Sequence, residues 1–138
     1  MKLGRYEFKQ TCSACPEQYD VFNEEGAQVA YVRLRWGSLY AECPDVGGTE
    51  IYYTGVGNDA GCFRSEDERR RHLRKIAKRI DLFNQPIKCP YCGEHHKICT
   101  EEFNKLETGD YIDVDCFECD NYYLVKIADG DIVVSKPY

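Results

Sequence analysis

Two Cys-x-x-Cys pairs in the last third of the chain constrain its fold more than any other feature. Cys89 and Cys92 form the first pair; Cys116 and Cys119 form the second, with 23 residues between Cys92 and Cys116. Four thiolates in two bidentate pairs suit the tetrahedral coordination of Zn²⁺, with metal–sulfur bonds of about 2.3 Å. The sequence therefore predicts a structural zinc site made of these four cysteines.

The residues that follow each pair support a turn around the metal. Each pair needs a tight turn that directs both sulfurs inward, so the next residue is expected at positive φ. Gly93 adopts this conformation freely, and Asp120 or Asn121 tolerates it better than most residues do. Residues 86–127 resemble the zinc-ribbon family, which implies two metal knuckles on short hairpins and no particular activity. Substitution of one cysteine ligand stays open, because other ligand types lie nearby: His95, His96 and Cys99.

A third Cys-x-x-Cys pair, Cys12 and Cys15, lies in the first half of the chain. Together with Cys43 and Cys62 it could hold a second zinc ion, so the chain is expected to bind one or two. The alternative is that these are small buried cysteines in a sheet. The chain has nine cysteines, no signal peptide and no long apolar run, which favours zinc in a reducing cytosol over disulfides.

The first part of the chain has the pattern of an antiparallel sheet followed by a helix. Strands are expected at 18–22, 29–36, the return strand after it, and 50–56. Ser65 to Glu68 form a capping box, and an apolar stripe follows at helical spacing: Leu73, Ile76, Ala77 and Ile80. We expect an α+β protein, with three to four antiparallel strands packed by one helix in residues 1–84. Residues 85–138 are expected to form a zinc ribbon with a short helix and a C-terminal hairpin.

The strand around Trp36 carries a specific hairpin prediction. Gly37-Ser38 suits a two-residue type II′ loop, which would place Trp36 opposite Leu39 on a continuous apolar face. Arg33 and Arg35 would then lie on the other face. Two interpretations fit these arginines: cross-strand pairing on a solvated face, or contact with nucleic acid.

The same part of the chain resembles a small uncharacterised domain of bacterial and phage proteins. The resemblance lies in four segments: 16–22 (PEQYDVF), 32–37 (VRLRWG), 44–48 (PDVGG) and 61–63 (GCF). It implies a phage or mobile-element origin, with the host cytosol as the location, and no catalytic activity. A nucleophilic role for Cys62 with His72 as base lacks any local signature, so we expect a protein that is not an enzyme.

Charge is distributed unevenly along the chain. Residues 1–84 carry 13 basic and 13 acidic side chains, whereas residues 85–138 carry 5 basic and 11 acidic ones. An acidic ribbon repels phosphate, so we expect it to bind a protein partner through Glu101, Glu102, Asp113 and Asp115. One form of this hypothesis is a counter-defence inhibitor, similar to an anti-CRISPR factor, that competes with nucleic acid for a basic groove. The alternative is a nucleic-acid-binding module that uses the basic helix 69–79 and strand 31–35, with these residues: Arg33, Arg35, Arg70, Arg71, Arg74 and Lys75.

Overall fold

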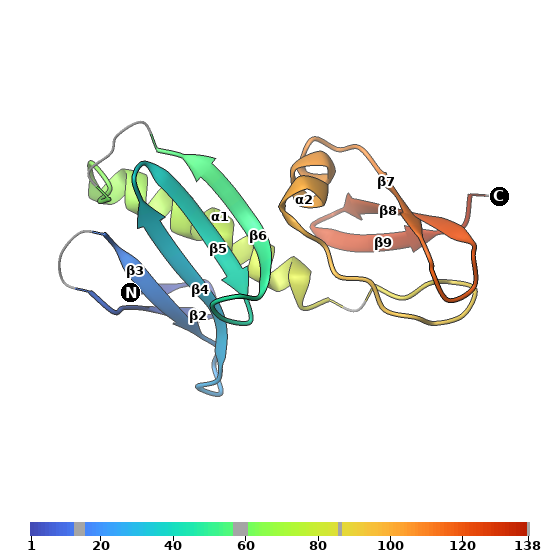
Figure 1. The fold of residues 1–138 in the computed structure, drawn as a ribbon, viewed down its shortest axis with the longest axis horizontal. Helices are drawn as coiled ribbons and strands as arrows, with labels where there is room; N and C mark the ends of the chain where they lie inside the picture. Colours follow the sequence, from blue (N-terminus) through green and yellow to red (C-terminus); the bar gives the residue numbers. More distant parts are fainter. Residues whose placement is uncertain (13–15, 57–60, 86, 138) are drawn as a thin grey trace. The chain divides into compact units, whose positions relative to one another are not determined.

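The computed structural model describes residues 1–12, 16–56, 61–85 and 87–137. The chain divides into two compact units, Met1–Ile80 and Asp81–Tyr138, and all of their elements except β1 are labelled in Figure 1. The sequence analysis placed the boundary between residues 84 and 85. Neither helix of the described chain combines the length and the apolar character that a membrane span needs.

The first unit contains a six-stranded antiparallel sheet in sequence order, so the prediction of three to four strands was wrong. The strands are β1 (Lys2–Leu3), β2 (Tyr6–Gln10), β3 (Gln18–Phe22), β4 (Gln28–Arg35), β5 (Ser38–Cys43) and β6 (Thr49–Gly55). The additional strands are β1, which has two residues, and β2, in which the alternation of buried and less buried side chains extends only over residues 6–8. They extend the sheet because Tyr6 and Phe8 bury their rings and Phe8 pairs with Val21.

The β4–β5 hairpin corrects the predicted register. Arg35 pairs with Ser38 and Leu34 pairs with Leu39, so the two-residue loop is Trp36-Gly37 instead of Gly37-Ser38. Both loop residues have positive φ, 51° and 76°, as a type I′ turn requires. Trp36 therefore leaves the pleated strand and is 74% exposed, whereas the predicted register would have buried it.

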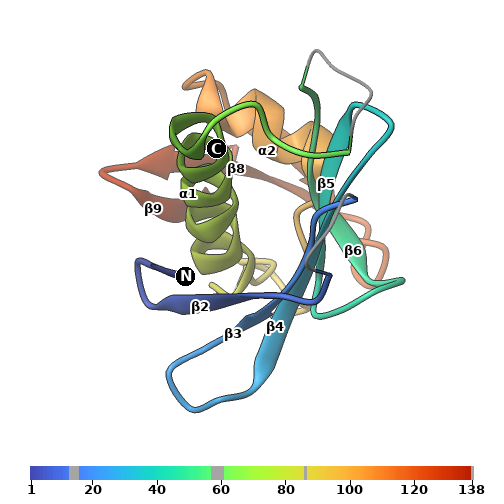
Figure 2. The same ribbon diagram turned by 90° about the vertical axis from the view of Figure 1, so that its left-hand side faces the viewer.

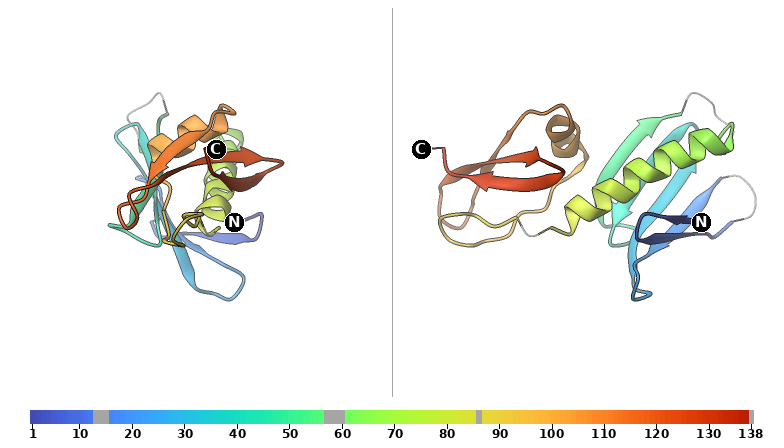
Figure 3. Two further views of the ribbon diagram at one scale, coloured as in Figure 1. Left: turned by 90° about the vertical axis from the view of Figure 1, so that its right-hand side faces the viewer. Right: turned by 180° about the vertical axis from the view of Figure 1, so that it is seen from behind.

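Helix α1 (Glu66–Phe83) covers one face of this sheet, as predicted (Figures 2 and 3). Leu73, Ile76 and Ile80 are fully buried, as are the inward-facing residues of the central strands, such as Val32 and Leu39. Burial of an aliphatic side chain stabilises a fold by about 1.5–3 kcal/mol, so this interface is the main core of the first unit.

The capping box at the start of α1 is only partly as predicted. The Ser65 hydroxyl accepts the backbone N–H of Glu68 at 3.1 Å. The Glu68 carboxylate accepts the N–H of Arg64 at 3.2 Å, one residue before the expected position. Both contacts satisfy N–H groups at the start of the helix, which have no partner within the helix itself.

The second unit combines α2 (Thr100–Glu107) with a three-stranded antiparallel sheet. Its strands are β7 (Ile112–Asp115), β8 (Tyr122–Ala128) and β9 (Asp131–Ser135). The short helix and the Asp129-Gly130 turn were both predicted, and both turn residues have positive φ. Phe103 and Leu106 from the helix and Tyr123 and Val125 from the sheet are buried, so they form the core of this unit.

Candidate metal centre

The first cysteine pair lies in a turn closed by backbone hydrogen bonds. The N–H of Gly93 donates to the carbonyl of Cys89 at 2.9 Å, and the N–H of Cys89 donates to the carbonyl of Glu94 at 2.8 Å. Gly93 has φ 83°, which confirms the expected left-handed residue after Cys92.

The second pair repeats this geometry. The N–H of Asp120 donates to the carbonyl of Cys116 at 2.9 Å, and the N–H of Cys116 donates to the carbonyl of Asn121 at 2.9 Å. Asp120, which follows Cys119, has φ 58°. Two cysteine pairs far apart in sequence thus form the same local turn, as expected of two metal knuckles.

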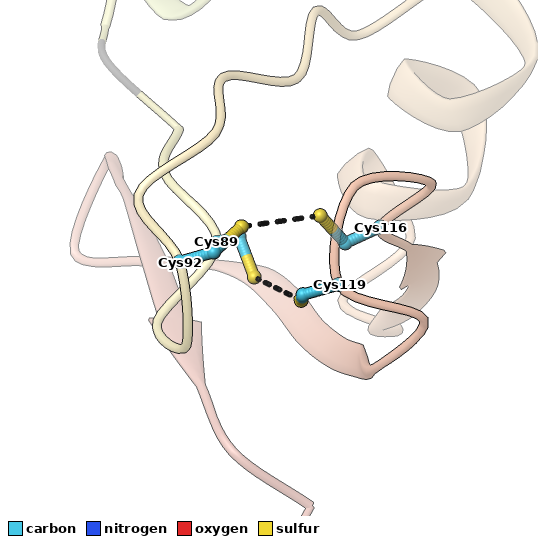
Figure 4. Close-up of side chains that lie close together, drawn as sticks. All are labelled: Cys89, Cys92, Cys116 and Cys119. Atoms are coloured by element: carbon cyan, nitrogen blue, oxygen red, sulfur yellow. Dashed lines mark hydrogen bonds between the residues drawn. The ribbon is translucent and has the colours of Figure 1, made fainter.

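The two pairs face each other, and their sulfur atoms converge (Figure 4). All four Sγ atoms lie within 4.8 Å of one another, with Cys89 and Cys119 3.7 Å apart and Cys92 and Cys116 3.4 Å apart. Tetrahedral coordination with metal–sulfur bonds of about 2.3 Å places two sulfurs about 3.8 Å apart. The spacing and the all-sulfur donor set therefore fit a tetrahedral metal ion.

The crowded thiols have divergent acidities. Burial raises the pKa of Cys89, but hydrogen bonds from the backbone of Cys92 and Tyr91 outweigh this effect and lower it to about 7. The backbone of Glu94 lowers the pKa of Cys92, but the neighbouring Cys116 thiol outweighs it and the pKa rises to about 12. The Cys89 thiol thus ionises readily while the Cys92 thiol holds its proton, and a divalent cation that binds the thiolates displaces such a proton.

The other potential metal ligands near the first cysteine pair are not part of this cluster. His96 Nε2 lies 3.1 Å from a carboxylate oxygen of Glu102, and the same carboxylate accepts the backbone N–H of Cys99 at 3.2 Å. Burial raises the pKa of Glu102, but the bonds from His96 and Cys99 outweigh it and lower that pKa. These residues fix the start of α2, with Cys99 at its N-cap.

The second predicted metal group is not assembled in the described part of the chain. Cys12 and Cys43 are not disulfide-bonded, and Cys43 is buried at the end of β5. Cys62 is disulfide-bonded, so the expectation of zinc ligands instead of disulfides was wrong for this cysteine, and a disulfide sulfur is not a thiolate ligand. Cys15 lies outside the described residues. Within the described ranges, the metal-compatible cysteine cluster is the one in the second unit.

The four acidic residues proposed for partner binding fall into two kinds. Glu101, Asp113 and Asp115 are exposed. Glu102 is half-buried and already bound to His96, so it stabilises the unit instead of offering a free carboxylate.

The basic residues of α1 do not all lie on one exposed surface, because the helix turns some of them towards solvent and others towards the sheet. Four of its members are exposed: Arg70, Arg71, Arg74 and Lys75. Arg79 is 3% exposed and donates to the carbonyl of Ile51 at 2.8 Å, so it belongs to the core.

Arg69 takes part in a buried ion pair that sequence reasoning missed. Its Nε and Nη2 donate to the Glu17 carboxylate at 3.0 and 2.7 Å, and Tyr19 and the N–H of Phe63 donate to the same group at 2.7 and 3.2 Å. Glu17 is 3% exposed. Its burial raises the pKa of Glu17, but the bonds from Arg69, Tyr19 and Phe63 outweigh this and lower it. A lone glutamate before a strand gives no signal for such a partner 52 residues away.

The proposed nucleic-acid surface does not form one continuous face. α1 covers one face of the sheet, whereas Arg33 and Arg35 alternate with the buried Val32 and Leu34 and so lie on the other (Figure 2). The exposed basic residues of α1 and the strand arginines are therefore separate surfaces, and each must be considered by itself.

The chain matches no protein-family model, and no curated protein or solved structure is significantly similar to it. The resemblance to a phage domain thus gains no support from these comparisons. The zinc-ribbon-like interpretation depends on the cysteine cluster itself.

Proposed function

We propose that this protein is a non-enzymatic zinc-binding interaction protein whose second unit binds a basic surface of a protein partner. Zinc suits the centre because four cysteine ligands in a tetrahedron are its usual structural site. Such a site has no open coordination position, so its role is to hold the two knuckles in place. The knuckles in turn present the side chains between the cysteines.

The observation that carries this proposal is the exposure of Phe117. This ring lies between Cys116 and Cys119 and is 94% exposed. Tyr91 lies between Cys89 and Cys92, directly before the second cysteine of that pair, and is 41% exposed. Large aromatic rings held in water by a rigid turn are typical of contact residues in interfaces.

A hollow beside Phe117 indicates the chemistry of the partner. It has a volume of about 230 Å³, and three of its lining residues are carboxylates: Glu94, Asp115 and Glu118. A lysine or arginine of a partner could place its charge among these carboxylates and its aliphatic stem against the ring. A basic groove of a nucleic-acid-binding enzyme is such a surface, which keeps the counter-defence hypothesis as a specific form of the proposal.

The test compares matched variants in the zinc-loaded protein. Phe117→Ser with Asp115→Lys alters the proposed contact, whereas Asp131→Lys makes the same change of charge at the β8–β9 turn. Pull-downs from nuclease-treated host lysate should recover a partner with the wild type and the turn variant but not with the knuckle variant. All three proteins should keep the same zinc content. Equal recovery by all three would refute the proposal.

The acidic residues also distinguish this function from nucleic-acid binding by the second unit. Reversal of Glu101, Asp113 and Asp115 to lysine should weaken a complex with a basic protein. If the second unit bound nucleic acid instead, the same reversal would raise affinity for an oligonucleotide by removing repulsion. A pull-down and a gel shift on this variant therefore give opposite results under the two hypotheses.

A further inference from the structure

The face of the six-stranded sheet opposite α1 carries an aromatic patch at its hairpin end. We define this patch by six residues: Arg33, Arg35, Trp36, Ser38, Tyr40 and Tyr53. Arg33 pairs with Tyr40 across β4 and β5, and Tyr40 pairs with Tyr53 across β5 and β6. Directly opposed residues project from the same face of a sheet, so these three side chains form a row across neighbouring strands about 4.8 Å apart.

Two of the three rings of the patch, Trp36 and Tyr53, are exposed and contact a neighbouring side chain, whereas Tyr40 is half-buried. Trp36 is 74% exposed and Tyr53 is 53% exposed. The guanidinium carbon of Arg35 lies 4.0 Å from the centre of the Trp36 ring, and the hydroxyls of Ser38 and Tyr53 are 3.0 Å apart. The patch therefore presents flat surfaces whose orientation is already fixed, which reduces the entropy lost on binding.

The charge of the patch indicates an anionic ligand. It contains two arginines and no carboxylate. The acidic residues of the same face lie outside the patch: Asp20 and Glu42 beside Tyr31, Glu50 opposite Glu42, and Glu7 on β2. The Nε of Arg33 is buried and has no hydrogen-bond partner among the described residues. An unsatisfied donor costs free energy, so Arg33 has more to gain from an incoming acceptor, after a change of rotamer, than a fully bonded arginine has.

We propose that the aromatic patch binds single-stranded nucleic acid, with bases stacked on Trp36, Tyr40 and Tyr53 and phosphates on Arg33 and Arg35. Aromatic rings beside basic groups on an open sheet are suited to unpaired bases, because every base offers a flat π surface. In a duplex these surfaces are stacked on one another and hidden. The proposal concerns the first unit and does not depend on the protein partner of the second.

Trp36 provides a direct assay, because it is the only tryptophan in the chain. Its fluorescence is measured during titration of the full-length, zinc-loaded protein with oligo(dT) or oligo(U) of about 12 nucleotides, a length within the usual range of single-strand sites. Both single strands should quench the emission at low salt, and a duplex of equal length should quench it much less. Absence of quenching up to about 100 µM, the weak end of non-specific affinities, would refute the proposal. So would equal quenching by the duplex.

A pair of charge variants separates the patch from the basic helix. Arg33→Ala with Arg35→Ala and Arg71→Ala with Arg74→Ala remove the same charge from opposite sides of the first unit. With a labelled single strand, anisotropy should show weaker binding only for the patch variant. For the patch variant, the slope of log K against log salt concentration should be shallower by about 1.4, because each of two lost phosphate contacts on a single strand contributes about 0.7 to that slope. An equal or greater loss in the helix variant would place binding on α1 and overturn the proposal.

A second pair of variants tests stacking without changing charge. Tyr53→Ala should weaken binding at least about fivefold, the lower limit for loss of one stacked base. The control is Tyr111→Ala, a tyrosine in the second unit with similar exposure, 59%. Circular dichroism confirms that both variants are folded. Equal affinity of the two variants would show that the Tyr53 ring does not contact bases and would overturn the stacking mechanism.

Discussion

The buried Glu17–Arg69 pair allows a quantitative test of what holds α1 against the sheet. Glu17→Gln keeps the volume of the side chain but leaves the Arg69 guanidinium without its buried counter-charge. Loss of one partner of a buried ion pair costs about 3–5 kcal/mol. The Arg69 side chain is 24% exposed and also contacts Glu66, so solvent and Glu66 reduce the penalty. We expect a loss of about 2–3 kcal/mol in the free energy of unfolding.

The pKa of Glu17 determines how the effect of Glu17→Gln on stability should change with pH. Glu17 has a pKa below its ordinary value of 4.5 in the folded protein. The stability that comes from its ionised form is fully present above about pH 4.5 and is lost as the pH falls through the lower folded-state pKa. Glutamine does not titrate, so the difference between wild type and variant should be constant from pH 7 to about pH 5 and shrink at lower pH.

The assay is urea denaturation followed by circular dichroism at 222 nm, a signal to which the 18-residue helix α1 contributes most. Glu66→Gln is the matched control, because it removes the exposed partner of the same arginine and should cost less than about 1 kcal/mol. If Glu17→Gln cost no more than Glu66→Gln, or if its effect did not change with pH, the buried ion pair would not be what stabilises the packing of α1 on the sheet.

Three further predictions concern the metal, the hairpin and a close backbone contact. Elemental analysis should find about one zinc per chain. Cys92→Ser should unfold the second unit while α1 keeps its circular dichroism signal, because metal binding and folding of such a small unit are coupled. A folded, metal-free protein would contradict this prediction. Trp36→Asn should raise the free energy of unfolding by about 0.5–1 kcal/mol in urea denaturation, since asparagine tolerates positive φ better than a bulky ring; a loss above 1 kcal/mol would mean that the ring supports the fold. Gly48→Ala should lower the melting temperature, because the added Cβ would lie 2.2 Å from the carbonyl oxygen of Cys43; an unchanged melting temperature would show that this loop can move aside.

The hairpin shows which part of a sheet can be predicted from sequence. The predicted and observed registers differ by two residues: Leu39 was placed opposite Trp36 and in fact pairs with Leu34. Because side chains alternate with a period of two, a slip of two preserves which face each residue occupies. Val32 and Leu34 were therefore correctly assigned to the core, although the turn was wrong. Trp36 was misplaced because it lies in the turn itself, where alternation ends.

The cysteine cluster could be predicted because each half of it is encoded by a few consecutive residues. Each pair and the left-handed residue after it define a knuckle within a few residues, so the sequence identifies both halves. The Glu17–Arg69 pair is the opposite case. It depends on how α1 crosses the sheet, and seven basic residues between positions 69 and 79 look alike until the helix shows which face each one occupies.

At position 36, the residue that would make the turn most stable differs from the residue that the proposed binding of bases requires. A type I′ turn before Gly37 is most stable with asparagine or glycine, yet the chain has its only tryptophan there, with φ 51°. Laboratory evolution under thermal selection alone should therefore discard Trp36 early. Selection for retention of a ligand by the first unit should keep it. The identity of this residue in evolved populations would thus report which of the two requirements had governed the sequence.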